Sequence, residues 1–336
     1  MQAYKLHAPK SLDNFKLGEY PEPTVRDYEV KIQVKATSLN YRDWALANGW
    51  FGYPGEKLPF IPFSDAAGLV TEVGAGVTKV RVGDRVAVNF FPDWHDGAFS
   101  AQKTFRSLGG SADGVLAEYV AFPESAVVKV PDSFSFEEAA AFPCAGVTAW
   151  HALVVQGQLK PTHTVLLQGT GGVSIFALQI AKLCGAQTII TSSSDEKLAQ
   201  AKALGADHLI NYKTTPDWEA SVQELTGGDG VDFVVEVAGQ LARSLRALKA
   251  GGTIFQIGGV DPSDEAPNLR PLALLTQRLQ GIYVGSTQML DDLVQAFDRN
   301  QLKPIISQTF GFNEAKDALN HMGSGAHFGK IVVQVG

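Results

Sequence analysis

A glycine-rich turn between an apolar strand and a helix carries the strongest chemical signal in the sequence. The stretch VLLQGTGGVSIFALQIAK, residues 165–182, follows the pattern G-x-G-x-x-small at Gly169, Gly171 and Ser174. Gly169 permits the tight turn, and the glycines at 171 and 172 allow the backbone to approach a pyrophosphate. The first amides of the helix attract an anion. We predict a dinucleotide site, because the sequence lacks the G-x-x-x-x-G-K-[ST] loop of nucleoside triphosphate sites.

The residues after the next strand indicate which dinucleotide is bound. An NAD site places an acidic residue there for the ribose 2′-hydroxyl, whereas residues 191–194 read TSSS and the first acid is Asp195. Ser192 and Ser193 can donate hydrogen bonds to a 2′-phosphate, and Lys197 can supply a positive charge. We therefore predict NADPH in preference to NADH. The alternative is a solvated helix N-terminus with a surface lysine.

The second half of the chain alternates apolar strands with helical patterns. Apolar residues spaced by three and four from Val173 to Cys184 predict one helix, and residues 195–205 predict the next, ended by Gly205. Such alternation predicts a doubly wound parallel sheet covered by helices on both faces. The predicted strands are residues 163–169, 187–194, 208–212, 231–237, 252–259 and 281–286.

The first part of the chain consists mainly of short alternating strands. EVKIQVKA places Val30, Ile32 and Val34 on one face, which predicts a half-buried strand in a β-rich, barrel-like domain. A helix and the strand GKIVVQVG follow Thr287, and we expect this strand to pair back onto the first domain. The predicted domains are residues 1–130 with 287–336, β-rich, and residues 131–286, α/β.

Composition excludes several classes of protein. The 336 residues are 45% hydrophobic and 19% charged, which is typical of a globular protein with a sizeable core. The net charge of −7 argues against nucleic acid or an anionic membrane surface as a partner. Two cysteines are too few for a disulfide framework, and no run of about 18 apolar residues predicts a membrane span. We expect a cytoplasmic protein.

Motifs along nearly the whole chain resemble the medium-chain dehydrogenase/reductase superfamily. They include SLNYRDW, PFSDAAGLVTEVGAGVTKVRVGDRV, GVLAEYV, PCAGVTAWHAL, GTGGVS, SSSDEKLAQAKALGAD and HFGKIVV. The resemblance implies a GroES-like catalytic domain, split between the two ends of the chain, and a Rossmann domain. It also implies oxidoreductase activity with a nicotinamide cofactor.

The positions that hold zinc in the alcohol dehydrogenases of this superfamily are altered. Asn40 replaces the first cysteine, and Ser64 and Asp65 stand where the second motif has His and Glu. Only Cys144 matches a ligand, whereas catalytic zinc needs about three Cys, His or carboxylate ligands. No cysteine lies between residues 89 and 120, where the structural zinc lobe would be. We predict a protein without zinc, in which Cys144 is a core thiol.

The resemblance also implies contacts with the cofactor beyond the glycine turn. Lys197 and Tyr212 match positions that hold the 2′-phosphate in the quinone oxidoreductase type, and Lys330 matches a basic residue near the pyrophosphate. Thr148 is expected near the nicotinamide. The remaining expected contacts follow the helix start or successive strands: Val173, Val237, Ala238, Ile257, Gly258, Val284 and Ser286.

Asn40, Tyr41 and Tyr53 are the catalytic candidates. Asn40 can donate to a substrate carbonyl, and the two tyrosines can donate a hydrogen bond or relay a proton, although they can equally be aromatic walls of the cleft. Arg42 and Asp43 are adjacent and can form a structural pair. Residues 90–110 replace the zinc lobe, and we favour a lid over the substrate cleft rather than a plain surface loop.

Three functions fit the sequence. The first is zinc-independent, NADPH-dependent reduction of quinones, enones or enals, because such acceptors spread the charge of an added hydride onto a remote oxygen that hydrogen bonds can stabilise. The second is an alcohol dehydrogenase or aldehyde reductase, and the third is a non-catalytic NADPH-binding protein. We expect a small carbonyl or quinone substrate, and a homodimer paired through residues 281–286.

Overall fold

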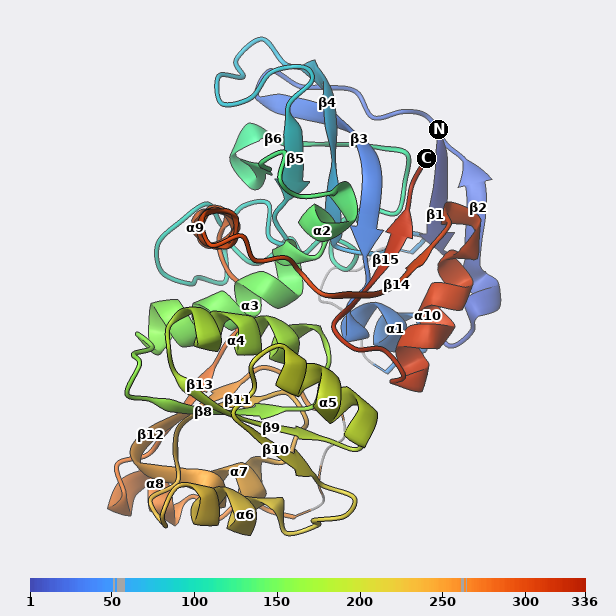
Figure 1. Ribbon diagram of the computed structural model, residues 1–336. Helices are drawn as coiled ribbons and strands as arrows, with labels where there is room; N and C mark the ends of the chain where they lie inside the picture. Colours follow the sequence, from blue (N-terminus) through green and yellow to red (C-terminus); the bar gives the residue numbers. More distant parts are fainter. Residues whose placement is uncertain (51, 53–57, 261–262, 264) are drawn as a thin grey trace. The chain divides into compact units, whose positions relative to one another are not determined.

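The computed structural model describes residues 1–50, 52, 58–260, 263 and 265–336 (Figure 1). It divides the chain into two compact units. Unit 1 comprises Met1–Val147 and Val284–Gly336, and unit 2 comprises Thr148–Tyr283. The sequence analysis placed these boundaries after residue 130 and before residue 287.

Unit 1 is built on a sheet of seven strands in the order β14-β15-β3-β4-β5-β7, with β6 also paired to β3. A separate hairpin joins β1 to β2. The strands are β1 (Gln2–Leu6), β2 (Phe15–Glu19), β3 (Glu29–Ser38), β4 (Asp65–Val73), β5 (Arg85–Val88), β6 (Tyr119–Pro123), β7 (Val127–Lys129), β14 (Ile306–Phe310) and β15 (Lys330–Gln334).

The alternation of apolar residues explains how β3 lies in this sheet. Val30, Ile32 and Val34 are fully buried in the core, while the residues between them are only partly buried. β15 pairs antiparallel with β3, with Val332 opposite Ser38. The structure thus confirms that the last strand returns to the first domain. The first unit is assembled from segments far apart in sequence (Figure 1).

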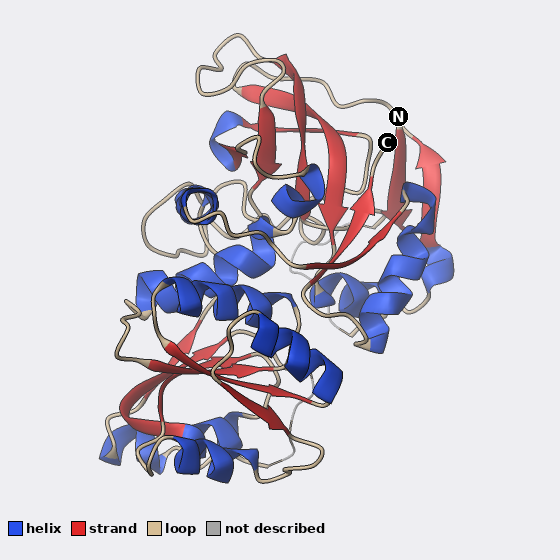
Figure 2. Cartoon of the chain, in the orientation of Figure 1, coloured by secondary structure: helices blue, strands red, loops and turns tan. Residues whose placement is uncertain are grey.

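Short helices connect the strands of unit 1 (Figure 2). Ser135 caps α2, because its hydroxyl accepts a hydrogen bond from the amide of Glu138. Ser286 caps α9 in the same way through the amide of Met289. The helices of unit 1 are α1 (Tyr41–Ala47), α2 (Phe136–Ala140), α9 (Thr287–Arg299) and α10 (Ala315–Ser324), with α3 (Val147–Trp150) at the boundary between the units.

Unit 2 contains a parallel sheet in the order β10-β9-β8-β11-β12-β13. Numbered within the unit this is 3-2-1-4-5-6, the order of the Rossmann fold. Helices α4 and α5 cover one face of the sheet, and α6, α7 and α8 cover the other (Figure 1). The elements are β8 (Thr164–Gln168), α4 (Gly172–Leu183), β9 (Gln187–Ser192), α5 (Asp195–Ala203), β10 (His208–Asn211), α6 (Trp218–Leu225), β11 (Val231–Glu236), α7 (Leu241–Ala247), β12 (Leu248–Gln256), α8 (Arg270–Leu274) and β13 (Arg278–Gly281).

The last strand of unit 2 differs from its prediction. The sequence analysis placed a strand at residues 281–286, but β13 ends at Gly281. Val284 has a φ of 51°, a left-handed conformation that a β-branched residue rarely adopts and that interrupts an extended run. The edge strand is therefore the polar segment Arg278–Gly281, and the apolar residues after it leave the sheet.

No helix among the described residues is long and apolar enough to cross a bilayer.

Gly68 on β4 is predicted to be required for the stability of unit 1. A Cβ atom there would lie 2.0 Å from the carbonyl oxygen of Gln33 on β3, so the paired strands would have to separate. We expect Gly68→Ala to lower the free energy of unfolding by at least about 2 kcal/mol. Gly281→Ala is the matched control, since a Cβ there meets nothing within 4 Å. Urea unfolding of both variants checks this, and equal midpoints would contradict it.

Candidate functional site

The glycine turn has the conformation that anion binding requires. Gly169 has a φ of 70°, and Gly171 is the N-cap of α4. The Ser174 hydroxyl donates to the Gln168 carbonyl at 2.6 Å, which ties the first turn of α4 to the end of β8. The first amides of α4, beginning at Gly172 and Val173, have no partner within the helix, because the first four amides of any helix lack one. The turn therefore offers donors to an anion.

The residues predicted to select the cofactor gather beside this turn. Tyr212 donates its amide to the Ser192 carbonyl at 3.1 Å, because β10 lies next to β9. The side chain of Ser194 caps α5 by accepting from the amide of Lys197, so the lysine lies in the first turn. Burial lowers the pKa of Lys197. The Asp195 carboxylate accepts from the Asn211 amide at 2.7 Å.

A buried carboxylate that the sequence analysis missed fixes the loop after β11, at the edge of the sheet where the strands end. Glu236 ends β11, is fully buried, and accepts hydrogen bonds from the amides of residues 238, 239 and 240. Its other oxygen accepts from the Gln168 side chain at 2.9 Å and from the Ser244 hydroxyl. Gln168 in turn accepts from the amides of Val237 and Ala238. The sequence feature that could have revealed Glu236 is an acidic residue at the end of the apolar run VDFVVEV.

The parallel sheet brings the other predicted cofactor contacts of unit 2 to the same edge. Val237 and Ala238 follow β11, and Ile257 and Gly258 follow β12. The amide of Ile257 donates to the Glu236 carbonyl at 2.9 Å, so the two loops are joined. Thr148 lies in α3 and is buried. The roles of these residues stay predictions, as do those of Val284 and Ser286, which begin the second segment of unit 1.

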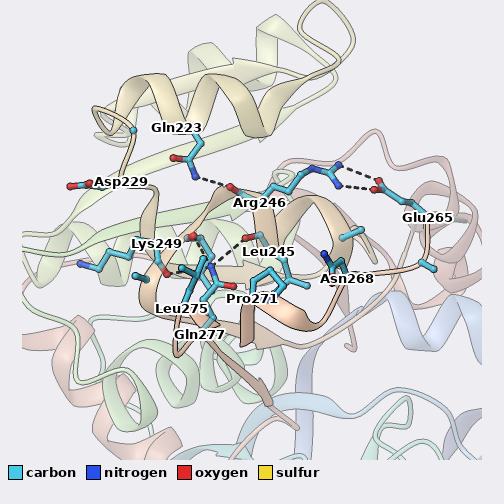
Figure 3. Close-up of a pocket in the computed structure, with 15 residues that line it drawn as sticks. Gln223, Asp229, Leu245, Arg246, Lys249, Glu265, Asn268, Pro271, Leu275 and Gln277 are labelled. Carbon is cyan, nitrogen blue, oxygen red and sulfur yellow. Dashed lines mark hydrogen bonds and ion pairs between the residues drawn. The ribbon is translucent and has the colours of Figure 1, made fainter. Parts of the chain in front are cut away.

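A cavity of about 760 Å³ lies at the opposite edge of the same sheet (Figure 3). Its wall includes Asp229, Lys249 and Gln277, which precede or begin strands β11, β12 and β13. Arg246, also in this wall, forms ion pairs with Glu219 and Glu265. The cavity is therefore at the amino ends of the strands, whereas the glycine turn is at their carboxyl ends, where ligands of such sheets bind.

Unit 1 contains a buried polar corner at the positions that match zinc ligands. Asp65 is fully buried and accepts hydrogen bonds from the Ser64 hydroxyl and from the amide of Cys144 at 3.2 Å. The Asn40 Nδ2 atom lies 3.4 Å from the Ser64 hydroxyl oxygen. The ammonium of Lys330 lies 2.7 Å from Asn40 Oδ1 and 3.6 Å from Asp65. The structure thus brings together five residues that the sequence analysis compared only by position.

These residues do not form a zinc donor set. Burial raises the pKa of the Cys144 thiol, which opposes the thiolate that zinc requires. Asn40 and Ser64 are neutral, and Lys330 brings a positive charge into the same corner. Within residues 1–50, 52, 58–260, 263 and 265–336, no three His, Cys, Asp or Glu side chains are grouped to hold a metal.

The neighbours of Asn40 make hydrogen bonds and ring contacts with other parts of unit 1. Asp43 caps the amide of Asn40 at 2.8 Å, while the Arg42 guanidinium donates to the carbonyls of Leu108 and Gly109, both at 2.7 Å. Tyr41 is partly buried, and its ring lies 5.4 Å from that of Trp44. Tyr53, the third catalytic candidate, lies outside the described residues.

The segment 90–110 is anchored at its start and exposed further along. Phe90, Phe91 and Trp94 are buried, and the Trp94 carbonyl accepts from the amide of Thr287 at the start of α9. Arg106 forms a bidentate ion pair with Asp93. The exposed aromatic residues are Phe99 and Phe105. A role as a lid stays a prediction.

Comparison with known proteins identifies the family. Residues 26–132 match the alcohol dehydrogenase GroES-like domain, and residues 172–299 match the zinc-binding dehydrogenase domain. A zinc-type alcohol dehydrogenase-like protein of Schizosaccharomyces pombe is 41% identical over 332 residues, which cover 96% of each chain. The chain belongs to the medium-chain dehydrogenase/reductase superfamily. It is therefore an oxidoreductase, from a superfamily that uses nicotinamide cofactors.

Two further relatives of this medium-chain oxidoreductase bear on its fold and chemistry. The crystal structure of a putative alcohol dehydrogenase from Sinorhizobium meliloti 1021 is 43% identical, with a TM-score of 0.91 and coverage of 99% of this chain and 98% of that one. A 2-methylene-furan-3-one reductase of Solanum lycopersicum is 30% identical and covers 99% of this chain and 79% of its own. These matches confirm the GroES-like and Rossmann domains.

Asp43 is predicted to make stability depend on pH. Burial raises its pKa to about 6 from the ordinary 3.8, against the opposing effects of Arg42 and the Asn40 amide. Between these two pKa values the folded state therefore binds more protons than the unfolded state. The free energy of unfolding falls by roughly 3 kcal/mol as the pH rises through this range. We expect Asp43→Asn to remove that dependence in urea unfolding between about pH 4 and pH 7.

The control for this prediction is Asp132→Asn, because the Asp132 side chain is 97% exposed. This variant should keep the pH dependence of the parent protein. Parallel curves for the parent and the Asp43→Asn variant would show that the buried carboxyl is not the source of the dependence.

Proposed function

We propose that this protein is a zinc-independent, NADPH-dependent reductase of quinones or of conjugated enones and enals. The observation that carries the proposal is the polar corner of unit 1. At the positions matching zinc ligands, the chain presents the amide of Asn40 and the hydroxyl of Ser64, with the Lys330 ammonium among them. Asn40, Ser64 and Lys330 are hydrogen-bond donors, and only Asp65 and Cys144 of this corner could ligate a metal, which is fewer than the three ligands of a catalytic zinc.

This set of groups suits an acceptor that is already activated. A metal assists alcohol oxidation by polarising the oxygen. A conjugated acceptor accepts hydride at carbon, and the charge moves to an oxygen that hydrogen-bond donors stabilise. The nicotinamide cofactor supplies the hydride when bound. Asn40 Nδ2 is the proposed donor to that oxygen, Tyr41 is a second candidate, and solvent protonates the enolate.

The preference for NADPH is supported by charge at the end of β9. Ser192 and Ser193 stand where an NAD site has a carboxylate, and Lys197 lies in the first turn of the next helix. Because burial lowers the pKa of Lys197, its ammonium lacks full solvation, and a 2′-phosphate would stabilise it. Asp195 is engaged by Asn211.

The names of two relatives support different acceptors. The tomato relative is named for the reduction of a conjugated methylene-furanone, and its sequence aligns with nearly all of this chain. The Sinorhizobium protein is named a putative alcohol dehydrogenase, and this favours an alcohol dehydrogenase or aldehyde reductase as the second candidate. The composition of the polar corner favours the first.

Initial rates of NADPH oxidation test the choice of acceptor. A quinone, a conjugated enone and the matched saturated aldehyde are compared in the presence of a metal chelator. We expect turnover of the quinone or the enone and little of the aldehyde, because only the conjugated acceptors disperse the charge without a Lewis acid. Turnover of the aldehyde alone, or loss of all activity with the chelator, would contradict the proposal.

Lys197→Met tests the choice of cofactor. Loss of a charged hydrogen bond to the 2′-phosphate should raise the dissociation constant for NADPH about 10- to 100-fold and leave that for NADH unchanged. Lys202→Met is the matched control, since Lys202 lies on the same helix and donates to the Asp207 carbonyl. Fluorescence titration with both cofactors measures the effect. Equal weakening of NADPH binding and NADH binding would show that Lys197 does not bind the 2′-phosphate.

A further inference from the structure

The ammonium of Lys330 is enclosed by oxygen atoms of its own unit. Its Nζ atom lies 2.7 Å from the Leu39 carbonyl and 2.7 Å from Asn40 Oδ1. The Asp65 carboxylate lies 3.6 Å away, and the lysine is 2% exposed. Of the three N–H donors of the ammonium, two are taken by Leu39 and Asn40, and the Asp65 carboxylate acts as an ion-pair partner beyond hydrogen-bond distance.

The backbone of β15 holds this lysine in place. Gly329 has a φ of 80°, and a Cβ there would lie 2.4 Å from the Ile305 carbonyl, so glycine is needed just before the lysine. The amide of Lys330 donates to Ile305, and the amide of Leu39 donates to the Ile331 carbonyl. The ammonium is thus attached to the strand that pairs with β3, immediately beside Asn40.

The position of the ammonium determines which end of the Asn40 amide is exposed to a ligand. Asn40 is the N-cap residue of α1, and its Oδ1 accepts a hydrogen bond from the Lys330 ammonium. The nitrogen must then point away from the ammonium. In the part of the chain that the structure describes, Ser64 at 3.4 Å is its acceptor, so its second N–H has none. Asn40 is partly exposed.

We infer that Lys330 is a positioning residue that acts through Asn40, by binding the amide oxygen and thereby presenting the amide nitrogen to the substrate oxygen. The inference rests on the donor role of Asn40 in the proposed function. Chains of hydrogen bonds polarise one another, so the ammonium also strengthens Asn40 as a donor. Asp65 balances the charge of the lysine within the buried corner.

This role differs from the pyrophosphate contact that the family resemblance implies for Lys330. A pyrophosphate contact would use the N–H that Leu39 and Asn40 leave, and it would compete with the Asp65 carboxylate for the ammonium. The two roles also predict different kinetics. A positioning residue changes kcat for the acceptor, whereas a pyrophosphate contact changes the affinity for the cofactor.

A double-mutant cycle between Lys330→Met and Asn40→Ala separates the two roles. The parent, both single variants and the double variant are assayed for kcat with the enone and for NADPH dissociation by fluorescence. We expect Lys330→Met to lower kcat about 10- to 100-fold with little change in NADPH affinity. In the Asn40→Ala background the same change should have almost no further effect on kcat, because the group through which the lysine acts is gone.

Three outcomes of the cycle would overturn the inference. Additive losses of kcat would show that Lys330 does not act through Asn40. A weaker NADPH affinity with unchanged kcat would assign the lysine to the pyrophosphate. Full activity of Asn40→Ala with the enone would also overturn the inference, while the reductase function would stand. If the parent reduces only the aldehyde, the proposed function fails, and the same cycle measured with the aldehyde still decides the role of Lys330.

Two further variants control for misfolding and for nonspecific effects of removing a lysine. Lys330→Met leaves the buried charge of Asp65 without its cation. If this variant does not fold, it is replaced in the cycle by a variant that carries both Lys330→Met and Asp65→Asn and so lacks both charges. Lys129→Met is the matched control, since it removes a lysine from an ion pair with Asp84 at 2.8 Å on the surface of the same unit. This control should keep the parent kcat and NADPH affinity.

Discussion

A lysine ammonium buried in a protein must be surrounded by oxygen atoms, and this requirement organises the polar corner of unit 1. Removing one partner of a buried ion pair costs about 3–5 kcal/mol, so Lys330 and Asp65 constrain each other. The carbonyl of Leu39 and the amide of Asn40 complete the shell of the lysine. Because those acceptors belong to the end of β3 and the start of α1, the ammonium fixes the strand, the helix and the proposed donor together.

A second constraint acts in unit 2, where all strands of the sheet run in one direction. Their carboxyl ends share an edge, so loops separated by nearly 90 residues, such as those after Gln168 and Gln256, lie along one line. Glu236 joins three of them through the Gln168 side chain, the amides of residues 238–240 in the loop before α7, and the amide of Ile257, which binds the Glu236 carbonyl. The edge is thus ordered by a buried carboxylate as well as by the sheet.

Patterns of residue type predicted most of this fold. Alternation identified β3, helical spacing identified α4, and the glycine turn was placed correctly between β8 and α4. The strand expected at residues 281–286 was wrong, because an apolar run does not reveal a left-handed residue such as Val284. Hydrogen-bond partners were also beyond prediction. Lys330 and Asn40 are 290 positions apart, and nothing in their local sequence shows that the ammonium meets the amide.

The order of strands in unit 1 also has a consequence for how the protein is made. On a ribosome, β3 and β4 emerge early, and the whole of unit 2 follows before β14 and β15 are synthesised. Until then the edge of β3 that β15 will cover remains unpaired, and unpaired edges favour aggregation. The nascent chain therefore carries Asp65 and Asn40 through most of translation without their cation. The final strand both closes the sheet and neutralises the corner.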